Sequence, residues 1–164
     1  MLEQTPLNQY LLLLITTYAA SIPAFFASIN APEELKQISP ILEHIKKLLL
    51  LAIFILFTLS MSFSPLAIIL TISAFIFYMK FKNKERTLLP LLAITLFSSL
   101  PRPKLLKLES ILIFMYILFT TTTYITTFEK NKKIKTPTKQ LILKILKKNS
   151  GYLLVGLIFF IIQL

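Results

Sequence analysis

Residues 48–79 read LLLLAIFILFTLSMSFSPLAIILTISAFIFYM, an apolar run without a single charged side chain. At ~1.5 Å per helical residue, this run is longer than the ~30 Å hydrocarbon core of a bilayer. The proline of the SFSP sequence at 62–65 disfavours helical geometry in the residue before it. We therefore expect two short helices, 48–63 and 66–79, joined by a turn. One long, tilted and Pro-kinked helix is the alternative.

The remainder of the chain has the same segregated composition. Of its 164 residues, 55% are hydrophobic and 15% are charged, and its mean hydropathy is +0.75. A soluble domain carries about a quarter charged residues, mixed with apolar ones. Here the charges form short blocks between apolar runs. This pattern predicts an all-α, polytopic integral membrane protein with a single membrane domain.

Apolar runs indicate five to six transmembrane or partly spanning helices. The first run has only Glu3 as a charged residue before it, so it lacks the positive n-region of a cleaved signal peptide and is expected to be retained, with a kink at Pro23. Residues 30–47 are mixed, and we expect Pro32 and Pro40 to break the chain there. The segments expected in the membrane are 10–29, 48–63, 66–79, 87–100, 108–128 and 151–164.

The distribution of cations predicts the orientation. Six crossings with the N-terminus outside place fifteen of the eighteen Lys and Arg residues on the cytoplasmic side, leaving Arg102, Lys104 and Lys107 outside. We therefore expect a multi-pass protein of the cell membrane with both termini outside. The segment 87–100 is short, and a re-entrant course for it is the alternative.

The segment 137–148 predicts a basic amphipathic helix on the cytoplasmic side. Thr136 is suited to the N-cap, Pro137 to the first turn, and Gly151 to the stop. One face is apolar and the remainder is cationic, so the helix is expected to lie on anionic lipid headgroups or to dock on a partner. The candidate contact residues are Leu141, Ile142, Ile145, Lys139, Lys144, Lys147 and Lys148.

Other polar residues suggest structural roles. Glu109 follows Arg102 and Lys104, which predicts an interfacial ion pair in preference to a proton relay. The threonines between 120 and 127 are expected to bond within or between helices. With no Cys, no Asp and His44 alone, we expect no catalytic residues, cofactor or metal site. The net charge of +11 is attributed to lipid headgroups, not to nucleic acid.

From about residue 39 onward, the order of features resembles the transmembrane coupling (T) subunit of energy-coupling-factor transporters. The resemblance rests on IKKLL at 45–49, FSPL at 63–66, and LPRPK at 100–104 before a long span with Met115 and Tyr116. It implies a non-catalytic subunit whose basic cytoplasmic helices contact ATPase subunits during small-solute transport. The family's Ala-Arg-Gly-type coupling motif is not present between 129 and 148.

A second hypothesis is a small structural or accessory subunit of a large membrane assembly of the respiratory or hydrogenase type. Short spans, two glycines and no evident buried charge favour such a scaffold. Its apolar surface would contact other membrane subunits. The two hypotheses differ because a coupling subunit must bind an ATPase, whereas a scaffold need not.

Overall fold

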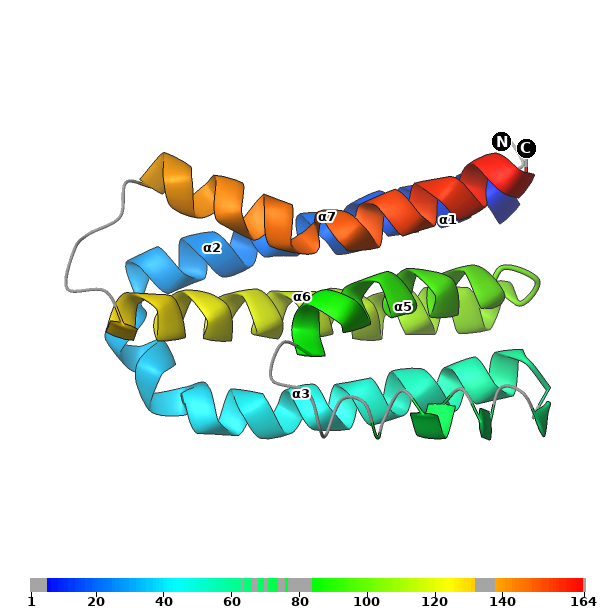
Figure 1. Cartoon of the computed structure of the whole chain (residues 1–164), viewed down its shortest axis with the longest axis horizontal. Helices are drawn as coiled ribbons and strands as arrows, with labels where there is room; N and C mark the ends of the chain where they lie inside the picture. The colour runs from blue at the N-terminus through cyan, green and yellow to red at the C-terminus, as the bar shows by residue number, and fades with distance from the viewer. Residues whose placement is uncertain are drawn as a thin grey trace.

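A computed structural model describes residues 6–62, 64–65, 68–69, 71–73, 76, 84–131 and 138–163. Every regular element within these residues is a helix, which confirms the predicted all-α class for them (Figure 1). The helices are α1 (Pro6–Ala19), α2 (Ser21–Asn30), α3 (Pro32–Ser60), α5 (Lys84–Ser98), α6 (Pro103–Asn131) and α7 (Thr138–Gln163).

Three helical stretches are long and apolar enough to cross a membrane. They are Pro6–Asn30, which comprises α1 and α2, Pro103–Thr127 within α6, and Gln140–Gln163 within α7. Helix α5 contributes a shorter apolar stretch, Leu88–Ser98. The apolar character of a membrane protein is therefore present in the fold, while the total of five to six segments stays a prediction.

The helices lie side by side in an elongated bundle with α6 at its centre. Helix α6 contacts α1, α2, α3 and α5, and α7 packs on α1, α2 and α5. The two termini lie at one end of the bundle, here called the terminal end; α3 and α7 begin at the opposite, distal end (Figure 1). Helix α5 begins part of the way along the bundle and runs to the terminal end, so it covers only part of the length of α6 (Figure 1).

The expected kink in the first span is present as the break between α1 and α2. Pro23 has no N–H to give to the carbonyl of Ala19, four residues earlier, and its ring crowds that carbonyl. The break falls there: Ala20 N–H bonds the Thr17 carbonyl at 3.2 Å, three residues back, before α2 resumes at Ser21.

The expected breaks in the segment 30–47 are only partly present. Ala31, at φ −134° and ψ 56°, separates α2 from α3, and Pro32 occupies the first turn of α3, where its missing N–H costs nothing. Pro40 does not break the chain, since α3 continues through it to Ser60. Burial of Leu42 and of later residues of α3 supplies the free energy that offsets the internal proline, about 3 kcal/mol.

The predicted amphipathic helix 137–148 and the predicted span 151–164 are one helix, α7, and not two. The expected stop at Gly151 is wrong. A β-carbon at Gly151 would lie 3.2 Å from Cγ of Pro90, so the glycine lets α5 approach α7 closely. At Gly156 a β-carbon would lie 2.3 Å from a methyl carbon of Leu14, which makes this the tighter of the two approaches.

A chain reversal follows α3. Ser62 has a left-handed φ of 52°, and the hydroxyl oxygens of Thr58 and Thr71 lie 3.2 Å apart. In one continuous helix, two residues thirteen apart would be separated by about 20 Å. The chain therefore turns back on α3 and does not continue as one long helix. Much of the predicted segment 66–79 lies outside the described residues.

This reversal predicts a specific crosslink. The chain has no Cys of its own, so Thr58→Cys with Thr71→Cys places one unique thiol pair in the protein. We expect oxidation in native membranes to close a disulfide, detected as a mass loss of two hydrogens. In the control pair, Thr58→Cys with Ile72→Cys, the second position is exposed, and we expect little closure. Equal closure in both pairs would contradict the reversal.

Candidate functional site

The buried face of α6 carries polar and charged side chains among apolar ones. Leu106, Glu109, Ile113, Tyr116 and Thr120 recur at three- and four-residue intervals, and each is at most 1% exposed. Because lipid cannot hydrogen-bond to these groups, their partners must come from the protein itself. The candidate functional site is this buried polar face of α6 together with the groups that contact it.

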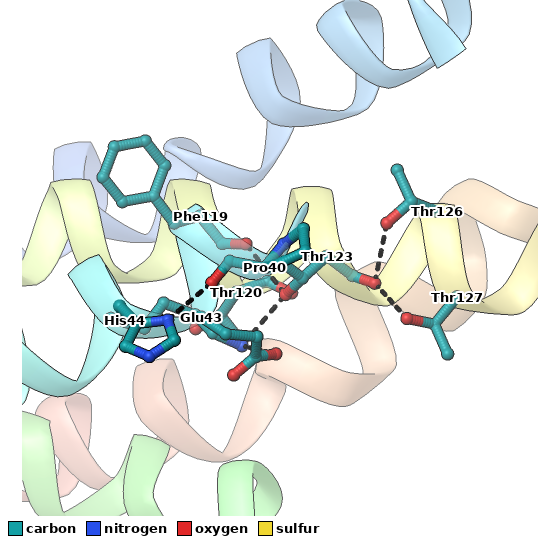
Figure 2. A network of polar contacts seen from close by, with 9 residues as sticks. Pro40, Glu43, His44, Phe119, Thr120, Thr123, Thr126 and Thr127 are labelled. Carbon is teal, nitrogen blue, oxygen red and sulfur yellow. Dashed lines mark hydrogen bonds and ion pairs between the residues drawn. The ribbon is translucent and has the colours of Figure 1, made fainter. Parts of the chain in front are cut away.

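At the distal end of this face, a buried lysine joins α3 to α6, and Figure 2 shows Glu43 of α3 close to Thr123 of α6 there. Lys46 is 1% exposed, and its ammonium donates to a carboxylate oxygen of Glu43 at 2.7 Å and to the hydroxyl of Thr123 at 3.0 Å. Glu43 is half-exposed, so the ion pair extends from the helix interface towards the surface. The charge-assisted hydrogen bond from Lys46 to Thr123 fixes α3 against α6, and the ion pair with Glu43 lies within α3.

The threonines of α6 bond mainly to their own helix, which is the packing role expected of them. The hydroxyl of Thr122 donates to the Leu118 carbonyl at 2.9 Å. That of Thr127 donates to the Thr123 carbonyl at 2.7 Å, a bond that Figure 2 shows. The hydroxyl of Thr123 donates to the Phe119 carbonyl at 3.0 Å while it accepts from Lys46.

One threonine connects α6 to α7. The side-chain amide of Asn149 is 1% exposed and donates to the hydroxyl of Thr121 at 3.4 Å. Further along α7, the hydroxyls of Tyr152 and Thr17 lie 2.7 Å apart, and the Tyr10 hydroxyl donates to the Gly156 carbonyl at 3.1 Å. Polar contacts therefore join α7 to both α1 and α6.

Towards the terminal end, Glu109 is fully buried and has different partners from those predicted. One of its carboxyl oxygens accepts from the hydroxyl of Ser99, which directly follows α5, and the other has no hydrogen-bond partner. Arg102 does not contact it; the guanidinium instead donates to the Leu59 carbonyl at 2.5 Å and to the Ser62 hydroxyl at 2.7 Å. Lys104 is exposed, so the predicted interfacial ion pair is corrected to a buried carboxyl at the end of α5.

The cationic half of α7 is held on the bundle by its apolar face. Leu141 and Ile145 are buried in a cluster with Phe25 of α2 and Ile125 of α6. The remaining candidates divide between exposed and packed positions. Ile142, Lys144 and Lys147 are exposed, Lys148 lies 4.1 Å from the centre of the Tyr124 ring, and the side chain of Lys139 is outside the described part.

The burial of Lys46 and Glu109 was missed from the sequence, although a pattern for each was available. Lys46 lies on the same face as Leu50 and Ile53, which are four and seven residues later on α3. Glu109 precedes Ile113 by the same step of four. A charged residue that shares a helix face with a buried apolar stripe is therefore expected to be buried. This criterion predicts burial better than the distance of the residue from the neighbouring charged block in the sequence.

Comparisons with known proteins give no identity to this arrangement: no family model, curated protein or solved structure matches the chain. Among the described residues, no three His or Glu side chains gather in a way that could hold a metal ion. The polar face of α6 must therefore be interpreted from its own chemistry.

The contact between Lys46 and Thr123 predicts a difference between two neighbouring threonines. Thr123→Val removes the hydroxyl that accepts from a buried ammonium, and we expect a loss of about 1.5–3 kcal/mol in the free energy of unfolding. Thr122→Val removes a hydroxyl that bonds to its own helix, and should cost less. The measurement is unfolding from mixed micelles by a denaturing detergent.

A double-mutant cycle with Lys46→Met separates this contact from general effects of the substitution. If the contact is formed, Thr123→Val should cost less in the Lys46→Met background than in the natural protein. Equal costs in both backgrounds, or equal costs for Thr122→Val and Thr123→Val, would show that the contact does not stabilise the fold.

Proposed function

We propose that this chain is a non-catalytic integral membrane subunit of a multi-protein complex, and that the cationic half of α7 binds a partner at the distal end. The observation that carries the proposal is the attachment of this half-helix. Leu141 and Ile145 are packed against α2 and α6, while Ile142, Lys144 and Lys147 stay exposed. A rigid, exposed surface of mixed apolar and cationic residues is suited to a protein or headgroup surface.

The lengths of the helices support this role for the distal end. Helix α7 has 26 residues and is about 39 Å long, so it exceeds a ~30 Å hydrocarbon core by about 9 Å, which is fewer than two turns. Helices α3 and α6 have 29 residues each and exceed it further. Glu33, Glu34 and Lys36 of α3 and Lys144 of α7 lie within about two turns of the distal starts of their helices, where the excess length would extend into the headgroup layer or beyond it.

The balance of charges favours a cytoplasmic location for this end. Lys36 lies near the distal start of α3, and Lys46 and Lys47 lie at the middle of that helix, while Lys144 and Lys147 lie in the distal half of α7. Because cations are enriched on the cytoplasmic side of membrane proteins, this distribution supports termini that face outside. Anionic headgroups of the inner leaflet would then contact the same lysines.

The partner we favour is a cytoplasmic ATPase subunit, by resemblance to the coupling subunits of energy-coupling-factor transporters, so that the chain takes part in small-solute transport. The alternative is a structural or accessory subunit of a respiratory or hydrogenase type of assembly. That alternative was favoured by the expectation that no charged side chain is buried. Lys46 and Glu109 are buried, which removes the argument.

Charge reversal on the exposed face of α7 tests the proposal. The tagged full-length chain is purified from its native membrane in mild detergent, and its partners are identified by mass spectrometry. We expect ATP-binding subunits to copurify, and at least a tenfold smaller yield of them with Lys144→Glu and Lys147→Glu together.

The matched control reverses two exposed lysines at the other end of the bundle, Lys104→Glu and Lys107→Glu, and should retain the partners. A large membrane complex that survives reversal at Lys144 and Lys147 would overturn the coupling role and favour the structural one. Loss of partners in both variants would indicate a defect of folding, which the thermal unfolding temperature of each purified variant identifies separately.

A further inference from the structure

Glu109 is buried, and the proposed function gives this residue no role. Glu109 lies in the stretch of α6 that is long and apolar enough to cross a membrane, fewer than two turns from Pro103, and is 0% exposed. An ionisable side chain in this position is costly to keep charged unless a positive charge or several hydrogen-bond donors compensate it.

The hydrogen-bond donors around Glu109 are too few for an isolated carboxylate. One carboxyl oxygen accepts from the Ser99 hydroxyl, and Thr95, one turn earlier on α5, lies beside the same carboxyl. The other oxygen, Oε1, is buried and has no hydrogen-bond partner. Ser99 and Thr95 are themselves at most 3% exposed, so the group is enclosed by protein.

The backbone next to Glu109 adds negative charge. Helix α5 ends at Ser98, and the C-terminus of a helix carries a partial negative charge, although the carbonyls of Thr95, Leu96 and Phe97 accept hydrogen bonds from Ser98, Ser99 and Leu100. A carboxylate beside such an end is repelled by it. The carboxyl and the helix end therefore both favour a positive charge between them.

The described cations do not supply this charge. The guanidinium of Arg102 is held by the end of α3, and Lys104 and Lys107 are exposed. The phenol of Tyr152 on α7 interacts electrostatically with Glu109, and the phenol of Tyr10 on α1 interacts with that of Tyr152. Both phenols are engaged elsewhere, with Gly156 and Thr17. The buried residues of α3 that share a hydrophobic cluster with Leu106 and Ile113 of α6 are Leu50, Ile53 and Phe54.

We infer that Glu109, with Ser99 and Thr95 at the end of α5, forms an intramembrane binding site for one monovalent cation, either a proton or an alkali-metal ion. A proton on Oε1 makes the carboxyl a neutral acid. An alkali-metal ion leaves it ionised and takes its remaining ligands from hydroxyl and carbonyl oxygens of the α5 terminus. Both occupants neutralise the same oxygen, and neither requires a partner subunit.

Infrared difference spectroscopy distinguishes the two occupants. The full chain is reconstituted in phosphatidylcholine vesicles in buffer whose only added cation is choline, and the spectrum of Glu109→Gln is subtracted. We expect the carbonyl stretch of a carboxylic acid at neutral pH, and its disappearance as the pH is raised. Glu43→Gln is the control, because Glu43 is half-exposed and ion-paired, and its removal should change only carboxylate bands.

Binding of an alkali-metal ion is tested by thermal unfolding of the protein in the same vesicles. If sodium or potassium is the occupant, the difference spectrum contains carboxylate bands, and the unfolding temperature rises with that chloride but not with choline chloride. This rise should be absent in Glu109→Gln. Carboxylate bands without any cation-specific rise would overturn the inference.

A second measurement covers the case in which Glu109→Gln does not fold. The natural protein is treated with a hydrophobic carbodiimide, which adds to protonated carboxyls in apolar surroundings, and the labelled residue is located by mass spectrometry. Labelling at Glu109 that falls as the pH rises supports the proton, and protection by sodium or potassium supports the metal ion. Labelling confined to exposed glutamates under all these conditions would count against both occupants.

Discussion

The bundle depends on one constraint: the polar groups on the buried face of α6 are shut off from water, so the hydrogen bonds that hold them come from the protein itself. Helix α6 lies at the centre and contacts four other helices, so its buried face determines what those helices present. At its distal end Thr123 receives the ammonium of Lys46, and Thr121 receives the amide of Asn149. These hydrogen bonds constrain the orientation and the axial position of the neighbouring helices on α6, in packing that is otherwise apolar.

The same constraint explains why apolar packing alone does not specify the arrangement. Between two membrane helices, aliphatic side chains gain little over their contacts with lipid tails. A buried ammonium, by contrast, costs several kcal/mol if it loses its partners. The contact of Lys46 with Thr123 therefore opposes sliding of α3 along α6, and Gly156 allows the close approach of α7 to Leu14 of α1.

Hydropathy was sufficient to predict helices and their approximate places, because long apolar runs without charges have few other structures in a bilayer. The kink before Pro23 followed from proline chemistry alone. Pro40 and Gly151 were expected to end helices and did not. At these positions local preference was outweighed by tertiary packing, of α3 on α6 and of α7 on α5. Such packing is not visible in a single sequence.

The error over Glu109 has a geometric origin. Arg102 lies in the turn before α6, and Lys104 precedes Glu109 by five residues, which places the two side chains about 140° apart around the helix. Nearness in the sequence was therefore a poor guide to contact. The burial of Glu109 can be predicted from its place on the same face of α6 as Ile113. This face is also the one that contacts the end of α5.

The threonines of α6 have a consequence for how this sequence can diverge. A hydroxyl that bonds to its own backbone, as in Thr122 and Thr127, presents mainly its methyl group to neighbouring helices. Valine has the same shape, so such positions are free to drift between the two residues. Thr121 and Thr123 accept hydrogen bonds from side chains of other helices, so these two positions are not free to change to valine. Distant relatives are therefore to be recognised by a pair of covarying positions, a lysine in phase with the apolar stripe of α3 and a hydroxyl opposite it on α6.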